Sequence, residues 1–230
     1  MKKLNLYRIA GFFLGATLIG AGALLTHGSG EASQAGGGPL LAQATDAEKP
    51  AGAQAQDSDT LENALGSPDA PVTMIEYASL TCHHCANFHL NVWPALRERF
   101  VDTGKVRIIY RDFPLDIVAL KASQLSHCVD PSRYFGFVKL LFAEQERWAF
   151  VPNPEAALRQ RARLAGLSDD RIDACLSDEA LQEKIINTRL EGQQAFDIQG
   201  TPTIVLNGRK FTGTMSIEAL AQVVESQLNR

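Results

Sequence analysis

The feature that most constrains the fold of this chain is a cysteine pair placed directly after a strand-like run. Residues Val72–Ala78 (VTMIEYA) alternate and are rich in β-formers, which predicts a strand. The motif Cys82-His83-His84-Cys85 follows almost at once and opens a helical pattern. Apolar residues then recur every fourth position and give this helix one apolar face: Phe88, Val92, Leu96 and Phe100. A CxxC motif alone can serve a metal site, a structural cross-link or a redox couple, so the rest of the chain must decide.

A second strand completes a strand–helix–strand unit. The segment Lys105–Phe113 (KVRIIYRDF) carries consecutive apolar residues, which is typical of a strand buried on both faces of a sheet. Two such strands joined by a helix are expected to be parallel, with a right-handed connection. Pro94 lies inside the connecting helix and predicts a kink, because its ring removes a donor and clashes with the preceding turn.

A helical insertion is predicted to interrupt this α/β domain. From about residue 115 to 180 the signals are all helical, and a longer helix follows at Asp178–Phe196. Strand character returns in Thr201–Gly213 (TPTIVLNGRKFTG), whose Asn-Gly pair is a strong hairpin signal. A last helix is expected after the capping residue Ser216.

Residues 1–25 have the pattern of a secretory signal. The basic start MKKLNLYR precedes an apolar run, Ile9–Leu25, that contains small residues. Ala21-Gly22-Ala23 offers an A-x-A cleavage site, and Ser33-Gln34-Ala35 is a weaker second choice. The apolar run also reaches the lower length limit of a membrane-spanning helix, so an uncleaved anchor is the alternative. Both interpretations place the body of the protein outside the cytoplasm.

The segment after the signal is predicted to be a flexible linker, residues 26–60. It is rich in Gly, Ala, Gln and Ser and lacks apolar periodicity. The folded domain is therefore expected over residues 61–230. A formal net charge of −4 gives no basic footprint, so we expect no nucleic-acid partner.

Two further cysteines lie in the predicted insertion. In an oxidising compartment four cysteines are most simply two disulfides. We expect Cys128 and Cys175 to bridge two helices, worth roughly 4 kcal/mol in the chain-entropy model, with two free buried thiols as the alternative. Structural zinc usually needs two separated ligand pairs, and these single cysteines supply no second pair. We therefore expect no metal.

Three stretches together resemble one protein family. They are Gly66–Cys85 (GSPDAPVTMIEYASLTCHHC), Tyr110–Asp116 (YRDFPLD) and Gly200–Gly208 (GTPTIVLNG), with the helical insertion between the last two. The chain resembles the DsbA-like branch of the thioredoxin superfamily, which consists of periplasmic thiol-disulfide oxidoreductases. The resemblance implies an α/β thioredoxin-like fold with a helical domain inserted into it, and no cofactor.

The resemblance also assigns roles to residues of this sequence. Cys82 matches the nucleophilic cysteine of the family and Cys85 its resolving partner, while Glu76 matches a buried acid that assists proton transfer. Thr201-Pro202 matches a loop whose proline is cis and lies against the disulfide. On residue pattern alone Glu76 could instead face solvent.

Two positions depart from the archetypal family pattern. The archetype has Cys-Pro-His-Cys, where this chain has His83 in place of the proline. Thr201 replaces the usual valine, and threonine before the cis-proline is also found in the disulfide isomerases. The resemblance therefore leaves open whether the couple works as an oxidant or as a reductant.

The predicted chemistry requires a thiolate on Cys82. The start of a helix supplies unpaired N–H groups and a partial positive charge that favour the anion, and His83 and His84 would add to this effect. Two further histidines, His89 and His127, show no partner pattern, so we expect surface or helix-face positions for them.

Three functions are compatible with these features. The first is an exported thiol oxidase that introduces disulfides into reduced or unfolded secreted proteins, acts as a monomer and, by resemblance, is regenerated by a DsbB-type membrane quinone-linked protein. The second is a reductase or isomerase of the same fold, which Thr201 favours. The third is a peptide-binding holdase with a vestigial redox centre.

Overall fold

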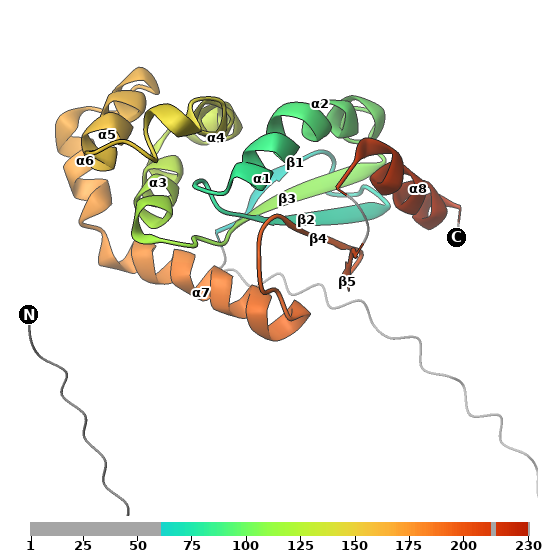
Figure 1. The fold of residues 1–230 in the computed structure, drawn as a ribbon. Coiled ribbons are helices and arrows are strands. Elements are labelled where there is room, and N and C mark those ends of the chain that lie inside the picture. The colour runs from blue at the N-terminus through green and yellow to red at the C-terminus, as the bar shows by residue number, and fades with distance from the viewer. Residues whose placement is uncertain (1–60, 213–214, 230) are drawn as a thin grey trace, which may run out of the picture. The chain divides into compact units, whose positions relative to one another are not determined.

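The computed structural model describes residues 61–212 and 215–229, which form a mixed sheet with helices around it (Figure 1). The strands are β1 Asn63–Leu65, β2 Val72–Ala78, β3 Val106–Asp112, β4 Thr203–Leu206 and β5 Arg209–Lys210. The α-helices are α1 His83–Asn87, α2 Trp93–Leu96, α3 Ile117–Cys128, α4 Tyr134–Ala143, α5 Pro154–Leu164, α6 Asp169–Leu176, α7 Glu179–Phe196 and α8 Ile217–Leu228. The π-helical turns are η1 Phe88–Val92 and η2 Arg97–Val101, and the 3₁₀ turns are η3 Pro131–Arg133 and η4 Gln145–Arg147.

The predicted signal and linker, residues 1–25 and 26–60, lie outside the described residues. Among the described residues no helix combines the length and the apolar character that a membrane crossing requires.

The sheet is built around the predicted parallel pair. β2 runs parallel to β3, β1 and β4 flank them as antiparallel neighbours, and the strand order is β1-β3-β2-β4-β5. The hairpin from β4 to β5 turns at Asn207 and Gly208, whose φ angles are both positive, at 44° and 77°. Positive φ at both central residues is what a two-residue hairpin turn of this kind requires, which explains the Asn-Gly signal.

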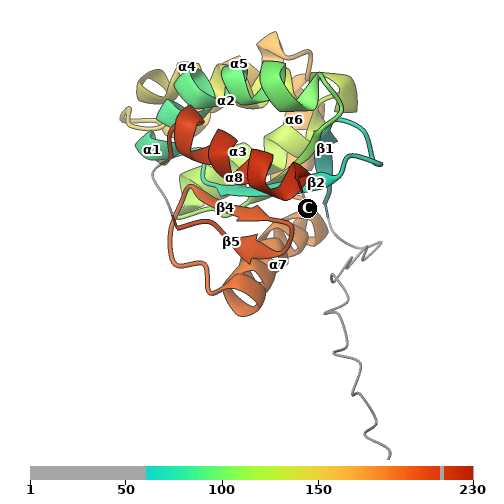
Figure 2. The same cartoon turned by 90° about the vertical axis from the view of Figure 1, so that its right-hand side faces the viewer.

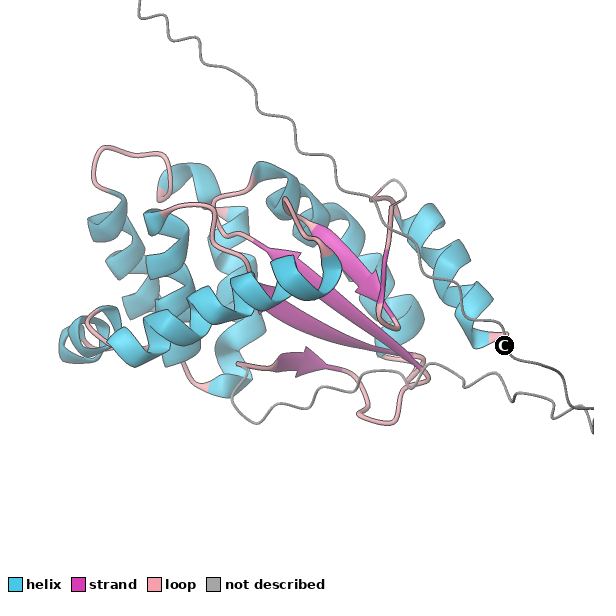
Figure 3. Ribbon diagram, turned by 90° about the horizontal axis from the view of Figure 1, so that it is seen from below, coloured by secondary structure: helices cyan, strands magenta, loops and turns pink. Residues whose placement is uncertain are grey.

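Helices cover both faces of the sheet (Figures 1 and 2). α1, α2 and α8 lie over one face, and α7 lies over the other. The first face buries side chains such as Met74 and Ile108 against Leu96 and Leu220. From below, α7 is seen to cross in front of the strands (Figure 3). A glycine in α7, Gly192, allows this close approach, because a Cβ atom there would lie 2.5 Å from the ring of Tyr77 in β2.

The helix that follows the cysteine motif is continuous from α1 to η2, although it is not uniform. The π-helical turn η1 directly precedes α2, in which Pro94 is an early residue, and η2 follows it. A π-helical turn offsets the hydrogen-bond ladder, which accommodates a residue that has no N–H donor. A kink was predicted at Pro94, and the structure shows π-helical turns before and after α2.

The inserted helices, which lie between β3 and α7 in the chain, pack an apolar core that they share with residues of β2, β3 and α1. Helices α3 to α6 bury a set of large side chains, which includes Leu125, Leu141, Phe142, Trp148 and Leu158. A disulfide between Cys128 of α3 and Cys175 of α6 joins two of these helices, with Cα atoms 6.3 Å apart. This separation lies within the usual range for a disulfide, about 4.4–6.8 Å.

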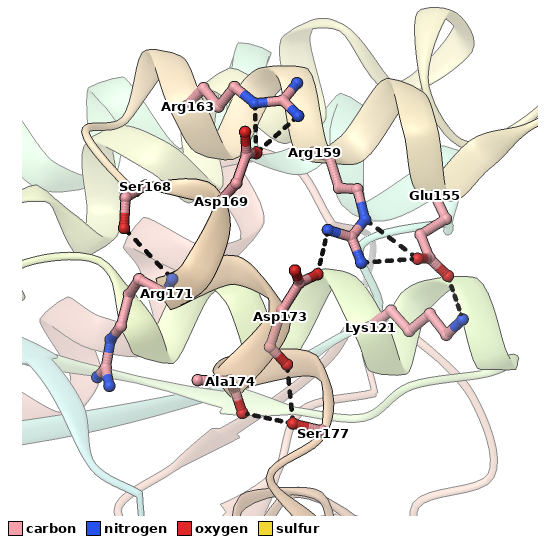
Figure 4. A network of polar contacts seen from close by, with 10 residues as sticks. All are labelled: Lys121, Glu155, Arg159, Arg163, Ser168, Asp169, Arg171, Asp173, Ala174 and Ser177. Carbon is pink, nitrogen blue, oxygen red and sulfur yellow. Dashed lines mark hydrogen bonds and ion pairs between the residues drawn. The ribbon is translucent and has the colours of Figure 1, made fainter.

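A chain of ion pairs links the outer surfaces of α3, α5 and α6 (Figure 4). Lys121 Nζ lies 2.5 Å from Glu155, and Arg159 bonds both Glu155 and Asp173, the latter at 2.6 Å. Hydrogen bonds from Lys121 and Arg159 lower the pKa of Glu155. Because these side chains are partly exposed to solvent, each pair contributes little free energy, and the packed core and the disulfide hold the insertion together.

One strand was not predicted from the sequence. β1 has only three residues, and it pairs with β3 at the edge of the sheet, Ala64 opposite Ile109. A run of three residues is too short to show an alternating pattern, so nothing in the sequence separates it from a loop. All the strands and helices that were predicted within the described residues are present.

Candidate active site

The two cysteines of the motif lie at the start of α1. Cys82 is the N-cap residue with an extended backbone, and its side chain is half-buried. Cys85 lies one turn further along the helix and is completely buried. Both are free thiols in this structure. Because the first N–H groups of a helix have no partner within the helix, they can donate to the sulfur of Cys82.

A second chain segment approaches the sulfur of Cys82 from the loop before β4. The peptide bond between Thr201 and Pro202 is cis. The thiol of Cys82 donates a hydrogen bond to the carbonyl oxygen of Thr201, with the two atoms 3.3 Å apart. Thr201 Oγ1 is buried and has no hydrogen-bond partner within residues 61–212 and 215–229. This hydroxyl is therefore available to donate to the sulfur once Cys82 is a thiolate.

The surroundings of Cys82 favour its anion. Its pKa is lowered from 9.0 to about 5, chiefly because the side chain of Cys85 hydrogen-bonds its sulfur. The side chain of Thr201 and the backbone N–H groups of Cys85 and His84 lower the pKa further, while partial burial opposes them. At neutral pH Cys82 is therefore a thiolate, which is the nucleophilic form of cysteine.

The surroundings of Cys85 have the opposite effect. Burial raises its pKa well above 9.0, and the nearby charges of Cys82 and Glu76 raise it further. Cys85 therefore keeps its proton while Cys82 is ionised, and its S–H group is the donor that stabilises the Cys82 thiolate. The two sulfurs are thus prepared for different tasks, Cys82 to attack first and Cys85 to act afterwards.

A buried acid is present where it was expected. Glu76 on β2 has no solvent exposure, so its side chain does not face solvent. Its Oε2 atom lies 3.0 Å from Nε2 of His89, on η1. The imidazole of His89 is stacked against Phe142, with ring centroids 4.5 Å apart, and against Trp93.

The two histidines inside the motif are both exposed, but they differ in their contacts. His83 Nε2 lies 2.7 Å from Glu146 Oε1. The ring of His83 is stacked almost parallel on Phe150, with centroids 4.7 Å apart. Glu146 and Phe150 follow α4, so the insertion fixes the position of the His83 ring. His84 contributes its backbone N–H to the sulfur of Cys82.

The insertion also binds the backbone around the motif. The buried side-chain amide of Gln145 donates to the carbonyl oxygens of Leu80, at 2.7 Å, and of Cys82, at 3.1 Å. On the other side of the loop Thr81 Oγ1 donates to Asp116 Oδ2 at 2.6 Å. The segment that carries Cys82 is therefore fixed by side chains from before and within the insertion.

Comparisons with known proteins agree with this geometry. The thioredoxin family model matches residues 58–226. The crystal structure of alpha-DsbA1 from Wolbachia pipientis is 35% identical with a TM-score of 0.68, over 74% of this chain and 92% of that one. The chain belongs to the thioredoxin family, in its DsbA-like branch.

Two further relatives show the range of this family. A structure described as a protein-disulfide isomerase, from Novosphingobium aromaticivorans, is 26% identical with a TM-score of 0.65, over 74% of this chain and 98% of that one. A Rickettsia typhi protein named as a protein-disulfide oxidoreductase is 30% identical over 74% of this chain. The aligned region spans 63% of that relative's length. The chemistry of the DsbA-like family is thiol-disulfide exchange. The asymmetric pair of Cys82 and Cys85 in this chain is suited to that chemistry.

The positions of two histidines differ from those predicted from the sequence. His89 and His127 were expected at surface or helix-face positions, yet the side chains of both are less than a tenth exposed, and each pairs with a buried carboxylate. His127 Nε2 lies 2.6 Å from Asp112 Oδ2. The carboxylate partners lie 13 and 15 positions away in the sequence, so no local spacing could reveal these pairs. Within the described ranges, no cluster of three or more His, Cys, Asp or Glu residues is arranged to hold a metal ion.

Proposed function

We propose that this protein is an exported thiol oxidase that donates a Cys82–Cys85 disulfide to secreted proteins during their folding. The observation that carries this proposal is the asymmetry of the two thiols, with a pKa of about 5 at Cys82 and a pKa well above the usual value at Cys85. The N-terminal pattern of residues 1–25 supports export.

A low pKa at Cys82 favours the oxidising direction. Interactions that stabilise the thiolate stabilise the reduced protein relative to the disulfide, so the disulfide becomes a stronger oxidant. They also make Cys82 a better leaving group, which accelerates its release from a mixed disulfide.

The reaction proceeds in two exchanges. A thiolate of the client attacks Cys82, the Cys82–Cys85 bond breaks, and Cys85 leaves with the electron pair and takes up a proton. A second client thiolate then attacks the client sulfur of the mixed disulfide, and Cys82 leaves as a stabilised thiolate. The client has gained a disulfide and lost two electrons, and the protein is reduced.

A concave surface at the cis-proline loop, whose Thr201 carbonyl contacts Cys82, is suited to an extended client segment. A cavity of about 440 Å³ is lined by residues on both sides of the cis-proline, which include Thr201, Pro202, Phe211 and Met215. Reoxidation needs an electron acceptor, for which the family resemblance suggests a DsbB-type membrane quinone-linked protein. We expect the oxidase to act as a monomer.

The decisive experiment is the equilibrium reduction potential of the Cys82–Cys85 couple in glutathione buffers. An oxidase should have a potential well above the thioredoxin value of about −270 mV, toward the value of about −120 mV for DsbA. A potential close to that of thioredoxin would refute the oxidase and indicate a reductase. Both states should be measured with Cys128 and Cys175 replaced by serine, so that one disulfide alone is titrated.

An isomerase is the second candidate, because one observation favours it. Thr201 Oγ1 is a buried hydroxyl beside the cis-proline without a partner in the described ranges, and disulfide isomerases also have threonine at this position. A scrambled disulfide protein separates the two functions, since an isomerase restores its activity without net oxidation. Cys82→Ala tests the holdase alternative, because peptide binding would then persist while all thiol chemistry is lost.

A further inference from the structure

Close to Cys85 the structure buries a carboxylate and an imidazole side by side. The side chains of Glu76 and His89 are 1% and 6% exposed, and their nearest polar atoms are 3.0 Å apart. Burying polar groups costs free energy unless they are paired, which accounts for the contact. Glu76 Oε1, in contrast, has no hydrogen-bond partner within the part of the chain that the structure describes. One carboxylate oxygen is held by His89, and the other is free to accept a proton.

His89 connects this buried pair to the protein surface. Its ring lines a cavity of about 260 Å³, together with Trp93 of α2 and Phe135 of α4. This cavity has no lining residue in common with the cavity at the cis-proline. His89 therefore contacts Glu76 in the interior and a solvent-accessible space away from the proposed client surface.

We propose that His89 positions Glu76 and relays protons between Glu76 and the solvent of this cavity. The inference rests on the proposed thiol exchange at Cys82 and concerns the steps in which Cys85 gains or loses a proton. It makes His89 a positioning residue, since the ring acts through Glu76 and does not touch a reacting sulfur.

The proposed relay would carry out a proton transfer that reoxidation requires. During reoxidation Cys82 is held in a mixed disulfide with the oxidant, and Cys85 must lose its proton before it can attack. Cys85 is completely buried, and its pKa lies well above the usual value because of that burial. A proton acceptor inside the protein is therefore required, together with an exit that the bound partner does not cover.

The reoxidation step conserves atoms and electrons. The Cys85 thiol transfers its proton to Glu76, and the resulting thiolate attacks the sulfur of Cys82. The Cys82–Cys85 bond forms, the bond from Cys82 to the oxidant breaks, and the oxidant's sulfur leaves with the electron pair. As Glu76 becomes protonated, the imidazolium of His89 keeps its Nε2–H group bonded to Glu76 and releases its Nδ1 proton to solvent in the cavity.

Several other titratable or charged groups surround the pair: Cys85 of α1, Tyr110 of β3, Tyr134 of α4, Arg97 and Lys139 at the cavity, and the second pair, Asp112 and His127. Burial raises the pKa of both tyrosines well above 10.0, so they stay neutral near physiological pH. Among these groups His127 is the other buried imidazole that pairs with a carboxylate, and it therefore supplies the control.

The test separates the two exchange steps. Reduced protein is mixed with glutathione disulfide, and acid-quenched samples are analysed by mass for the mixed disulfide at Cys82 and for the Cys82–Cys85 bond. We expect His89→Gln to form the mixed disulfide within twofold of the wild-type rate. The second step should slow by roughly one to two orders of magnitude, the low end of general acid–base contributions, and its pH profile should change between pH 5 and 8.

His127→Gln is the matched control, because it removes a second buried imidazole–carboxylate pair whose side chains are 7% and 4% exposed. It should lower stability to a similar extent and leave both steps unchanged. If His89→Gln resolves the mixed disulfide at the wild-type rate and pH dependence, the relay is refuted. Failure of the wild type to form the mixed disulfide would instead refute the proposed oxidase, so the two failures are distinguishable.

Chemical rescue separates proton relay from packing. His89→Gly leaves a ring-sized space that is continuous with the cavity of about 260 Å³. Imidazole should restore the second step several-fold, whereas pyrazole, which has the same shape but is far less basic, should not. Equal rescue by imidazole and pyrazole would show that His89 has only a packing role.

If neither His89→Gln nor His89→Gly folds, a ¹⁵N titration of the His89 ring in the wild type decides. Identical titration curves for the reduced and the oxidised protein would refute the proposed coupling between His89 and the cysteine pair.

Discussion

The lowered pKa of Cys82 predicts that the reduced protein gains stability with pH and that the oxidised protein does not. A thiol with a lower pKa in the folded state stabilises the fold above that pKa, and this stabilisation is lost as the pH falls through it, here about 5. The unfolded thiol titrates at about 8.5, so the gain should accumulate between pH 5 and 8. In the oxidised protein Cys82 has no thiol, so this contribution is absent.

The magnitude follows from proton linkage. While the unfolded chain binds one proton more than the folded chain, the free energy of unfolding rises by about 1.4 kcal/mol for each pH unit. Between pH 5 and 8 this amounts to about 4 kcal/mol. Because solvent screens interactions at the half-buried sulfur, we expect about 2–3 kcal/mol. Cys85 does not disturb the comparison, since its raised pKa leaves it protonated in both folded and unfolded chains over this window.

Urea unfolding at four pH values from 5 to 8 measures this difference. Both redox states should be studied in a Cys128→Ser/Cys175→Ser background, so that the reductant acts on the active-site pair alone. The difference between the reduced and the oxidised protein should widen steadily as the pH rises. The control is reduced Cys82→Ser, which should show no such increase. Parallel pH profiles for the two redox states, or an undiminished rise in Cys82→Ser, would refute the assignment of a stabilised thiolate to Cys82.

Three further changes test the framework of the site. Replacing Cys128 and Cys175 with serine opens a disulfide whose sequence separation is 47, and should lower the unfolding free energy by about 4 kcal/mol in urea titrations while leaving the glutathione potential unchanged. Gly192→Ala puts a Cβ atom 2.5 Å from the Tyr77 ring and should cost about 1–3 kcal/mol in thermal unfolding. Gln145→Leu removes the side-chain donor to the carbonyl of Leu80 and one of the two donors to the carbonyl of Cys82, and urea unfolding should report a loss of about 1–3 kcal/mol. A loss below about 0.5 kcal/mol in any of these would contradict the contact concerned, because changes of that size are usual for surface substitutions that disturb nothing.

Local sequence signals predicted the parts of the fold that have local causes. The β2 strand is found at its predicted residues, and Ser216 caps α8 through a hydrogen bond from a nearby backbone N–H group. In each case the residues that determine the structure are within a few positions of it. The short strand β1 lacked such a signal, since its pairing partner lies more than 40 residues away.

The site was predictable only in part, for the same reason. The motif and the family resemblance pointed to Cys82, Cys85 and Pro202, because those residues carry recognisable patterns. No local sequence pattern indicates the pairing of His89 with Glu76 or the packing of Phe150 on His83. The first contact joins β2 to the helix that follows it, and the second arises where the insertion packs against the start of α1; both involve residues of ordinary surface or core type.

The contacts of His83 have a consequence for how variants of this site should be compared. One residue of the dipeptide between the cysteines, His83, contacts residues of a distant loop. The effect of exchanging the dipeptide therefore depends on that loop. Grafting the archetypal Cys-Pro-His-Cys motif would remove the ring that packs on Phe150, which is already 49% exposed, and would remove the hydrogen-bond partner of Glu146 at position 83. Exchanges in the motif are therefore epistatic with positions 146 and 150, and the three positions should be varied as one unit.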